Sequence, residues 1–392
     1  MSNRFAARVA QVKPSATIAM SAKAAELKAA GKDVISLSMG EPDFDTPEHI
    51  RKAAIEAIEA GQTRYTAVDG TPELKQAVIS KFQRDNDLAY EPDQVLCSTG
   101  AKQSLYNLMQ ALIGEDDEVL IPAPYWVSYP DMVRLAGGAP VTLNTTLKND
   151  FLVTPSQLKS SINENTRLLI LNSPSNPSGR AYTRKHLAEL GEVLLEHPRI
   201  MICVDDIYEH IWWASEPFST LAQVVPGLKD RTITTNGVSK AYAMTGWRIG
   251  YAGGPAELIK EMRKIQSQST SNPCSISQAA AAAALNGNQD CVAEMCQAFR
   301  ERHDWLVPAL NALPGVSCSP GEGSFYAFAD FSEAIEKLGF KDDLQMAEHL
   351  LENALVASVP GTAFGTPGHL RLSFACALDT LEKAVDRIAK VL

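Results

Sequence analysis

The sequence predicts an α/β fold, with a large domain built on a mostly parallel central sheet and a smaller α+β domain after it. Two observations lead to this prediction. In the middle of the chain, short apolar runs alternate with amphipathic stretches of helical period. Toward the C-terminus, two strand-like runs flank a single helical pattern. Strands that alternate with helices favour a parallel sheet with ligands bound outside the carboxyl ends of its strands.

The expected strands of the large domain are short and apolar, at residues 95–98, 118–122, 168–172, 200–204 and 231–235. The helix after the first strand places one apolar face on the sheet, formed by Leu105, Leu108, Met109 and Leu112. Gly137-Gly138 is expected to end the helix that follows the second strand. Thr183 is the expected N-cap of a further helix, whose apolar face carries Leu187, Leu190 and Leu194.

The smaller domain is expected to contain strands at Phe325–Phe328 and Leu370–Ala375, separated by a helix around Leu344–Leu355. The longest purely apolar run, Ala279–Leu285, is too short to span a bilayer. No apolar segment follows the basic residues near the N-terminus, so no signal peptide is expected.

The composition is that of an ordinary globular protein and narrows the possible partners. The chain has 392 residues, 45% of them hydrophobic and 21% charged, with a formal net charge of −10. This acidic balance argues against nucleic acid as a partner, although a small anion can still bind at a locally positive site. The seven cysteines are scattered without a CxxC pair, which predicts reduced thiols and no metal centre. We therefore expect a cytoplasmic enzyme that binds neither nucleic acid nor membrane.

Two candidate site features directly follow the first and fourth expected strands. The turn Ser98-Thr99-Gly100-Ala101-Lys102 leads into a helix N-terminus, where free N–H groups and the helix dipole suit a phosphate. The alternative is an ordinary βα turn. Asp205 could keep the nitrogen of a pyridine ring protonated, or it could simply cap a helix.

Two further features follow the other strands. The loop Asn172–Gly179 is rich in turn-forming residues, and Asn176 could donate its amide to a ligand oxygen. Lys240 follows Gly237-Val238-Ser239, with Arg248 eight residues later. A lysine among small and apolar residues loses its proton more readily and can form an imine, although most single lysines are solvated.

The segment Gly237–Gly250 resembles the pyridoxal-phosphate attachment pattern of class I aminotransferases at every fixed position. The resemblance covers almost the whole chain and includes Gly40–Phe44, Ala123–Tyr129 and Arg371–Ser373. It implies a fold-type I transferase that uses pyridoxal 5′-phosphate. Within the family, the chain is most similar to bacterial aspartate aminotransferases, whose relatives include aspartate/prephenate aminotransferases.

The resemblance implies how the cofactor is held. Lys240 carries it as a Schiff base and moves the proton of the reaction, and Asp205 pairs with the ring nitrogen. Tyr208 and Asn176 donate hydrogen bonds to the phenolic oxygen. Trp126 stacks on the ring. Alternatively, Trp126 and Tyr208 are aromatic residues of the hydrophobic core.

The phosphate is expected on Arg248 and on the turn that contains Gly100, Ala101 and Lys102. Tyr65 is expected to reach the phosphate of a partner subunit, which implies a homodimer with shared active sites; alternatively, it is a plain surface residue.

For the substrate, the resemblance assigns the α-carboxylate to a two-pronged pair with Arg371. Gly40 lets the backbone approach the substrate, which Trp126 and Asn176 also contact. In this subgroup a lysine, here Lys102, binds the distal carboxylate, unless Lys102 merely lies near the phosphate or in solvent. The N-terminal segment is expected to fold over the mouth of the site and to add Ser15 and Lys13.

Two positions depart from many relatives: Asp206 stands where a glutamate is common, and Gly237 where a serine would give one more hydroxyl to the phosphate. We expect a large cofactor-binding domain at residues 46–285 and a small domain formed by residues 1–45 and 286–392.

The expected reaction is the ping-pong transfer of an amino group from L-aspartate to 2-oxoglutarate. The alternatives are an aminotransferase for prephenate or aromatic substrates and, more distantly, a pyridoxal-phosphate-dependent C–S lyase. The same domain also occurs fused in transcription regulators, but no basic helix-turn-helix precedes it here.

Overall fold

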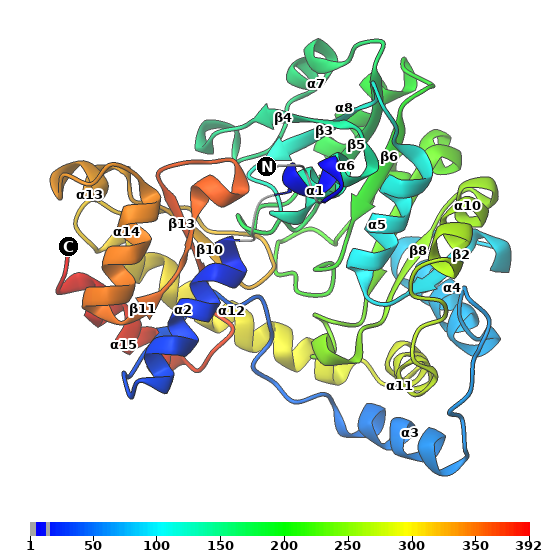
Figure 1. The fold of residues 1–392 in the computed structure, drawn as a ribbon, viewed down its shortest axis with the longest axis horizontal. Helices are drawn as coiled ribbons and strands as arrows, with labels where there is room; N and C mark the ends of the chain where they lie inside the picture. Colours follow the sequence, from blue (N-terminus) through cyan, green and yellow to red (C-terminus); the bar gives the residue numbers. More distant parts are fainter. Residues whose placement is uncertain (1–4, 13–15) are drawn as a thin grey trace.

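A seven-stranded sheet forms the centre of the larger part of the molecule (Figure 1). The computed structural model describes residues 5–12 and 16–392. The strands in their order across the sheet are β2 (Val95–Ser98), β8 (Gly250–Gly253), β7 (Thr232–Gly237), β6 (Met201–Asp205), β5 (Thr166–Asn172), β3 (Glu118–Ala123) and β4 (Ala139–Asn144). Only β8 runs antiparallel to its neighbours, so the predicted mostly parallel sheet is confirmed.

Helices cover both faces of this sheet because its inner strands are apolar on both sides. In β5, Leu168 and Ile170 pack into one core cluster, while Leu169 and Leu171 pack into another on the opposite face. The helices of this part are α3 (Glu48–Glu59), α4 (Pro72–Asn86), α5 (Ala101–Leu112), α6 (Ser128–Ala136), α7 (Pro155–Ser161), α8 (Arg184–Leu195), α9 (Leu221–Val224), α10 (Ala256–Ser267) and α11 (Ser275–Asn286).

Two predicted helix boundaries, the end at Gly137-Gly138 and the N-cap at Thr183, are confirmed. Gly137 ends α6 in the left-handed conformation, with φ of 97°. The Thr183 side chain accepts a hydrogen bond from the His186 amide and begins α8. The strands β4 and β8 were not predicted. β4 is a largely exposed edge strand that contains Pro140, and β8 consists of only four residues, two of them glycines.

The second body holds the four-stranded antiparallel sheet of β12 (Val359–Pro360), β13 (His369–Ser373), β10 (Tyr326–Asp330) and β9 (Ser317–Cys318), and it lies to the left in Figure 1. Its helices are α2 (Ala16–Ala29), α12 (Asp290–Asn311), α13 (Ser332–Lys337), α14 (Asp343–His349) and α15 (Leu378–Ala389). The expected helix around 344–355 is thus α14, followed by the π-helical turn η5 (Leu350–Ala354).

The N-terminal part of the chain joins this second body. The short strand β1 (Ile35–Ser36) pairs in parallel with β11 (Val356–Ala357). The same core cluster contains Met20 and Leu37 from the N-terminal part and Ile388 from α15. The remaining elements are α1 (Ala7–Ala10) and the 3₁₀ turns η1 (Pro92–Gln94), η2 (Leu147–Asn149), η3 (Pro226–Arg231), η4 (Thr245–Trp247) and η6 (Gly361–Phe364).

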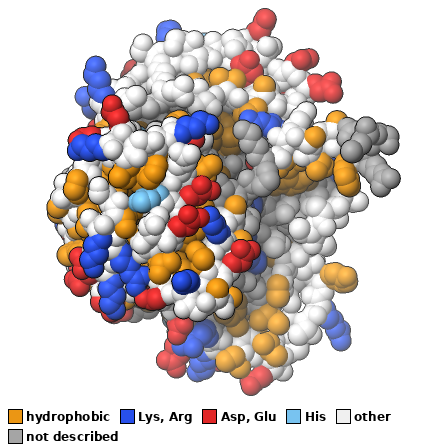
Figure 2. All heavy atoms as spheres, turned by 60° about the vertical axis from the view of Figure 1, so that its left-hand side comes forward, with side chains coloured by type: hydrophobic (Ala, Val, Ile, Leu, Met, Phe, Trp, Pro, Cys, Tyr) orange, Lys and Arg blue, Asp and Glu red, His pale blue; other side chains and the backbone are white. Residues whose placement is uncertain are grey.

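Within residues 5–12 and 16–392, no helix combines the length and the apolar character needed to cross a membrane. On the face of the molecule in Figure 2, acidic and basic side chains are interspersed, and neither sign gathers into one large area.

Candidate active site

A cavity of 380 Å³ lies where the carboxyl ends of β5, β6 and β7 face β10 and β13 of the smaller sheet. Residues from both bodies line it. Ten of the side chains or backbones predicted from the sequence meet there, namely Gly40, Ala101, Lys102, Trp126, Asn176, Asp205, Tyr208, Lys240, Arg248 and Arg371.

Lys240 follows β7 and projects into the cavity, where its Nζ donates a hydrogen bond of 2.6 Å to the carbonyl oxygen of Gly40. Burial lowers the pKa of Lys240 to about 8, and the positive charges of Arg371 and Arg248 act in the same direction. A fraction of the amine is therefore neutral near pH 7, and a neutral amine can act as a nucleophile or accept a proton.

Asp205 ends β6 with one carboxylate oxygen bonded and the other free. Oδ2 accepts a hydrogen bond of 2.6 Å from the Tyr129 hydroxyl, whereas Oδ1 is buried and has no hydrogen-bond partner within residues 5–12 and 16–392. Burial raises the pKa of Asp205 to about 6, against the opposing effect of the Tyr129 hydrogen bond. A buried acceptor left open at a cavity suits a ligand N–H group.

One end of the cavity is arranged for an anion. The helix α5 begins at Ala101, and its N-cap, Gly100, has φ of 83° and offers no side chain to the first N–H groups. The Arg248 guanidinium lies so close to Gly100 that a Cβ there would collide with it. Free helix N–H groups beside an arginine form a site that a phosphate fits.

Arg371 lies on β13 at the other end and is held from several sides. Its Nη1 donates to Asn176 Oδ1 at 2.9 Å and its Nη2 to the Ser38 carbonyl oxygen at 2.6 Å. Its Nε is buried and has no hydrogen-bond partner in the part of the chain that the structure describes. The guanidinium carbon lies 4.4 Å from the ring centre of Tyr326 and 5.1 Å from that of Phe364. A guanidinium held in this way can pair with a carboxylate.

Two of the aromatic residues named from the sequence, Trp126 and Tyr208, border the cavity. Trp126 is half-buried, its ring contacts Tyr129 edge-on, and the Lys102 ammonium lies 4.7 Å from its centre. Tyr208 is buried, and its hydroxyl lies 3.0 Å from that of Tyr326.

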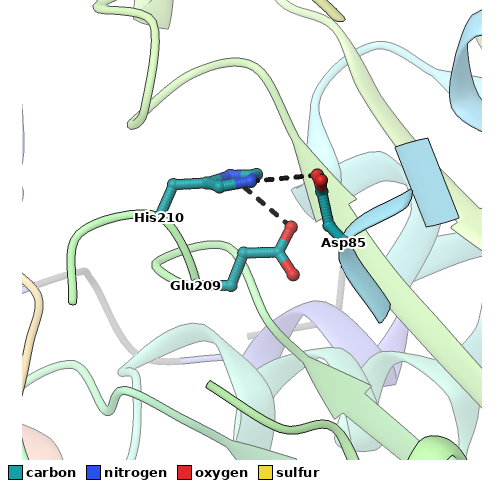
Figure 3. Close-up of side chains that lie close together, drawn as sticks. All are labelled: Asp85, Glu209 and His210. Atoms are coloured by element: carbon teal, nitrogen blue, oxygen red, sulfur yellow. Dashed lines mark hydrogen bonds and ion pairs between the residues drawn. The ribbon is translucent and has the colours of Figure 1, made fainter. Parts of the chain in front are cut away.

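Tyr208 and the next residue, Glu209, point to opposite sides of the chain. Glu209 points away from the cavity and binds the ammonium of Lys81 and the amides of Asn86 and Asn236, both at 2.7 Å. Figure 3 shows Glu209 with His210 and Asp85, three groups close enough to hold a metal ion. Lys81 already pairs with Glu209 and Arg84 with Asp85, and these two positive charges disfavour a metal there.

Among the cavity residues to which the sequence assigned no role are three with polar groups at the centre of its hydrogen bonding, Tyr129, Asn172 and Tyr326. A signal existed for two of them. Tyr129 lies one helical turn after Trp126, and Asn172 begins the turn-rich loop and donates to the Asp205 carbonyl oxygen at 2.7 Å. Tyr326 is an ordinary buried strand residue in the sequence pattern, which gave no signal.

The remaining predicted residues lie elsewhere. Tyr65 is 92% exposed and does not line this cavity, and Lys13 and Ser15 lie outside the described residues. Asp206 is buried, and burial and the nearby Glu209 raise its pKa well above the ordinary value. At Gly237, a Cβ would lie 2.9 Å from the Ile249 carbonyl oxygen, so a serine would require the backbone to shift.

Comparison with known proteins gives close matches over the full length. Residues 32–388 match the family described as aminotransferase class I and II. The aspartate/prephenate aminotransferase of Nitrosomonas europaea is 53% identical, over 99% of this chain and 100% of that protein. The crystal structure of the aspartate aminotransferase from Rhizobium meliloti matches with a TM-score of 0.95 and 49% identity, over 99% of this chain and 98% of that one. The Thermus thermophilus aspartate aminotransferase with maleate matches with a TM-score of 0.93 and 43% identity, over 99% of each chain.

Proposed function

The chain belongs to the class I and II aminotransferases, and from this premise we propose that it transfers the amino group of L-aspartate to 2-oxoglutarate. The products are oxaloacetate and L-glutamate, and the cofactor is pyridoxal 5′-phosphate. One observation carries the proposal: Lys240, the open oxygen of Asp205 and the free Nε of Arg371 border a single cavity. The names of the full-length relatives support aspartate as the donor.

The residues of the cavity fit this cofactor. Asp205 Oδ1 is an open acceptor for the ring N–H, the N-terminus of α5 and Arg248 form a place for the phosphate, and Lys240 is an amine of lowered pKa between them. We assign the ring face to Trp126 and the phenolic oxygen to Tyr208 and Asn176, with Gly100, Ala101 and Lys102 at the phosphate. When bound, the cofactor supplies a ring that withdraws electrons from the substrate Cα.

The residues of the protein position the substrate and move its proton. Arg371 holds the α-carboxylate through its free Nε and an adjacent nitrogen, and this pairing fixes where Cα lies in the cavity. Lys240 Nζ takes the proton from Cα and returns it later in the cycle, which an amine with a pKa of about 8 can do near neutral pH. Gly40 brings its carbonyl oxygen within 2.6 Å of that Nζ, and a side chain at this position would meet Tyr326.

We assign the distal carboxylate of aspartate to Lys102 because its ammonium borders the cavity beside Trp126. The Thermus thermophilus protein has been solved with maleate, which is a dicarboxylate, and this supports the assignment. Burial lowers the pKa of Lys102, and the charge of Arg248 adds to the effect. A carboxylate beside Lys102 would offset both effects. The contributions expected from Ser15 and Lys13 remain predictions.

A homodimer with shared sites accounts for three exposed side chains. Ile55 and Ile58 on α3 are 54% and 53% exposed, and Tyr65 follows that helix. A partner subunit that covers α3 would bury this apolar surface and bring Tyr65 to its phosphate. We also propose the division into a large domain, 46–285, and a small domain, 1–45 with 286–392, and a cytoplasmic location.

Initial rates with a panel of oxo acids test the function. We expect 2-oxoglutarate to be the best acceptor with aspartate as donor. Faster turnover of prephenate would favour the second candidate, which the name of the Nitrosomonas europaea relative supports. Incubation with cysteine and no oxo acid separates transamination from elimination, because elimination breaks the Cβ–S bond and releases sulfide, ammonia and pyruvate continuously, whereas half a transamination stops after one equivalent.

A further inference from the structure

Tyr326 connects three parts of the cavity through one buried side chain. It lies on β10, opposite Ser373 of β13, and is 2% exposed. Its hydroxyl lies 3.0 Å from that of Tyr208, and its ring lies beneath the Arg371 guanidinium at 4.4 Å. A Cβ built on Gly40 would lie 2.5 Å from the same hydroxyl, so little space remains around it.

In the hydrogen bond between Tyr326 and Tyr208, one hydroxyl donates its proton and the other accepts. Each tyrosine has a single O–H to donate, and at 3.0 Å either one can be the donor. Burial raises the pKa of Tyr326, and burial together with Tyr326 raises that of Tyr208 well above its ordinary value. Both therefore keep their protons at neutral pH. The charged groups that act on the pair are Arg371 and Asp205.

A third oxygen near Tyr208 fixes the direction of this hydrogen bond. If Tyr208 gives its only proton to a ligand oxygen, the bond to Tyr326 persists only when Tyr326 is the donor. A hydroxyl that accepts a hydrogen bond becomes a stronger donor itself, because linked hydrogen bonds polarise one another. The Tyr326 hydroxyl would therefore strengthen what Tyr208 donates.

We propose that Tyr326 is a positioning residue that donates its hydroxyl proton to Tyr208 and so directs the Tyr208 proton to the ring oxygen of the cofactor. The inference rests on the proposed function, because pyridoxal phosphate is the group that brings this oxygen. The ring of Tyr326 has a separate task, the support of Arg371. Hydroxyl and ring can therefore be removed one at a time.

The test is a pH titration of the absorbance of the bound cofactor in the holoenzyme. Tyr326→Phe removes only the hydroxyl, so the ionised ring oxygen is less stabilised, and we expect the titration midpoint to rise by about 0.4–1 pH unit. The ring remains under Arg371, so KM for aspartate should stay within about two-fold. Tyr326→Leu removes the ring as well and should raise KM in addition to shifting the midpoint.

Tyr182→Phe is the matched control because it also deletes a buried tyrosine hydroxyl, one that accepts from the Val153 amide at 3.2 Å and does not line the cavity. Its midpoint should equal that of the unsubstituted enzyme. An unshifted midpoint in Tyr326→Phe would overturn the role of Tyr326 and leave the proposed function intact. If the unsubstituted protein bound no pyridoxal phosphate, the proposed function would fail, and this inference with it.

Discussion

At the end of β6, on the cavity side, Asp205 keeps one buried carboxylate oxygen for which the described residues offer no hydrogen-bond partner. On the opposite side, four residues later, both oxygens of Glu209 are bonded to Lys81, Asn86 or Asn236. Burial raises the pKa of both carboxyls, and it takes that of Asp205 to about 6. At Glu209, the charges of Lys81 and His210 and the hydrogen bonds from Asn86 and Lys81 together outweigh burial and lower the pKa. At the cavity, the open carboxylate oxygen of Asp205 is available to a ligand, whereas the saturated carboxylate of Glu209 holds parts of the fold together.

The comparison predicts that Lys240→Ala abolishes activity without weakening the fold. Turnover should fall by at least roughly 10³-fold because the amine that moves the Cα proton is lost. The thermal midpoint of the cofactor-free protein should stay the same or rise, since a buried amine of lowered pKa destabilises the folded state. Single-turnover kinetics and a thermal melt measure the two effects, and a near-normal rate would show that another residue moves the proton.

On the opposite side, Lys81→Met should act on stability. It leaves the Glu209 carboxylate buried without its cation, which should lower the free energy of unfolding by about 3–5 kcal/mol. Denaturant titration measures the loss. The double variant Lys81→Met with Glu209→Gln removes the stranded charge and should recover much of it. A loss below about 1 kcal/mol in Lys81→Met would contradict the view that the contacts of Glu209 with Lys81, Asn86 and Asn236 stabilise the loop after β6.

Lys102→Ala tests selectivity at the mouth of the cavity. Losing a charge-assisted contact should lower kcat/KM for aspartate about 10–150-fold. An amino acid without a distal carboxylate, such as alanine, should be affected much less. The decisive quantity is therefore the ratio of kcat/KM for aspartate to that for alanine in enzyme and variant. If that ratio does not change, Lys102 does not select the dicarboxylate.

The smallest expected effect concerns Tyr129→Phe and the pH dependence of cofactor binding. The Tyr129 hydrogen bond lowers the pKa of Asp205 against burial, so its loss should raise that pKa further above about 6. Ionised Asp205 favours the protonated ring, so affinity should decline as the pH falls through this pKa. The pH at which affinity declines should rise by about 0.4–1 pH unit, measured by cofactor titration from pH 5 to 8. If affinity declined at the same pH in Tyr129→Phe as in the control Tyr182→Phe, the Tyr129 hydrogen bond would not set the pKa of Asp205.

The sequence predicted those parts of the fold that depend on local or periodic patterns. The apolar runs of β5 and β6 and the cap at Thr183 are recognisable because burial on both faces and the unpaired amides of a helix start require particular residue types. The edge strand β4 and the glycine-containing β8 lack such a pattern.

Much of the site was predictable because the resemblance places residues at strand ends, and the structure brings ten of them to one cavity. Their roles remain predictions. What could not be predicted are contacts between distant segments. Lys81 and Glu209 are 128 positions apart, and Tyr326 and Tyr208 are 118 positions apart, and no local pattern in the sequence signals either contact.

The pairing of β1 with β11 has a consequence for how the protein is made. Residues 35–36 bond to residues 356–357, so the N-terminal strand finds its partner only when most of the chain has been synthesised. At a synthesis rate of about 5–20 residues per second, β1 waits for roughly 15–65 s. The central sheet, whose strands span residues 95–253, is complete well before that. On the ribosome, the body with the larger sheet can therefore fold first, while the apolar residues of the N-terminal segment remain uncovered until the C-terminal body arrives.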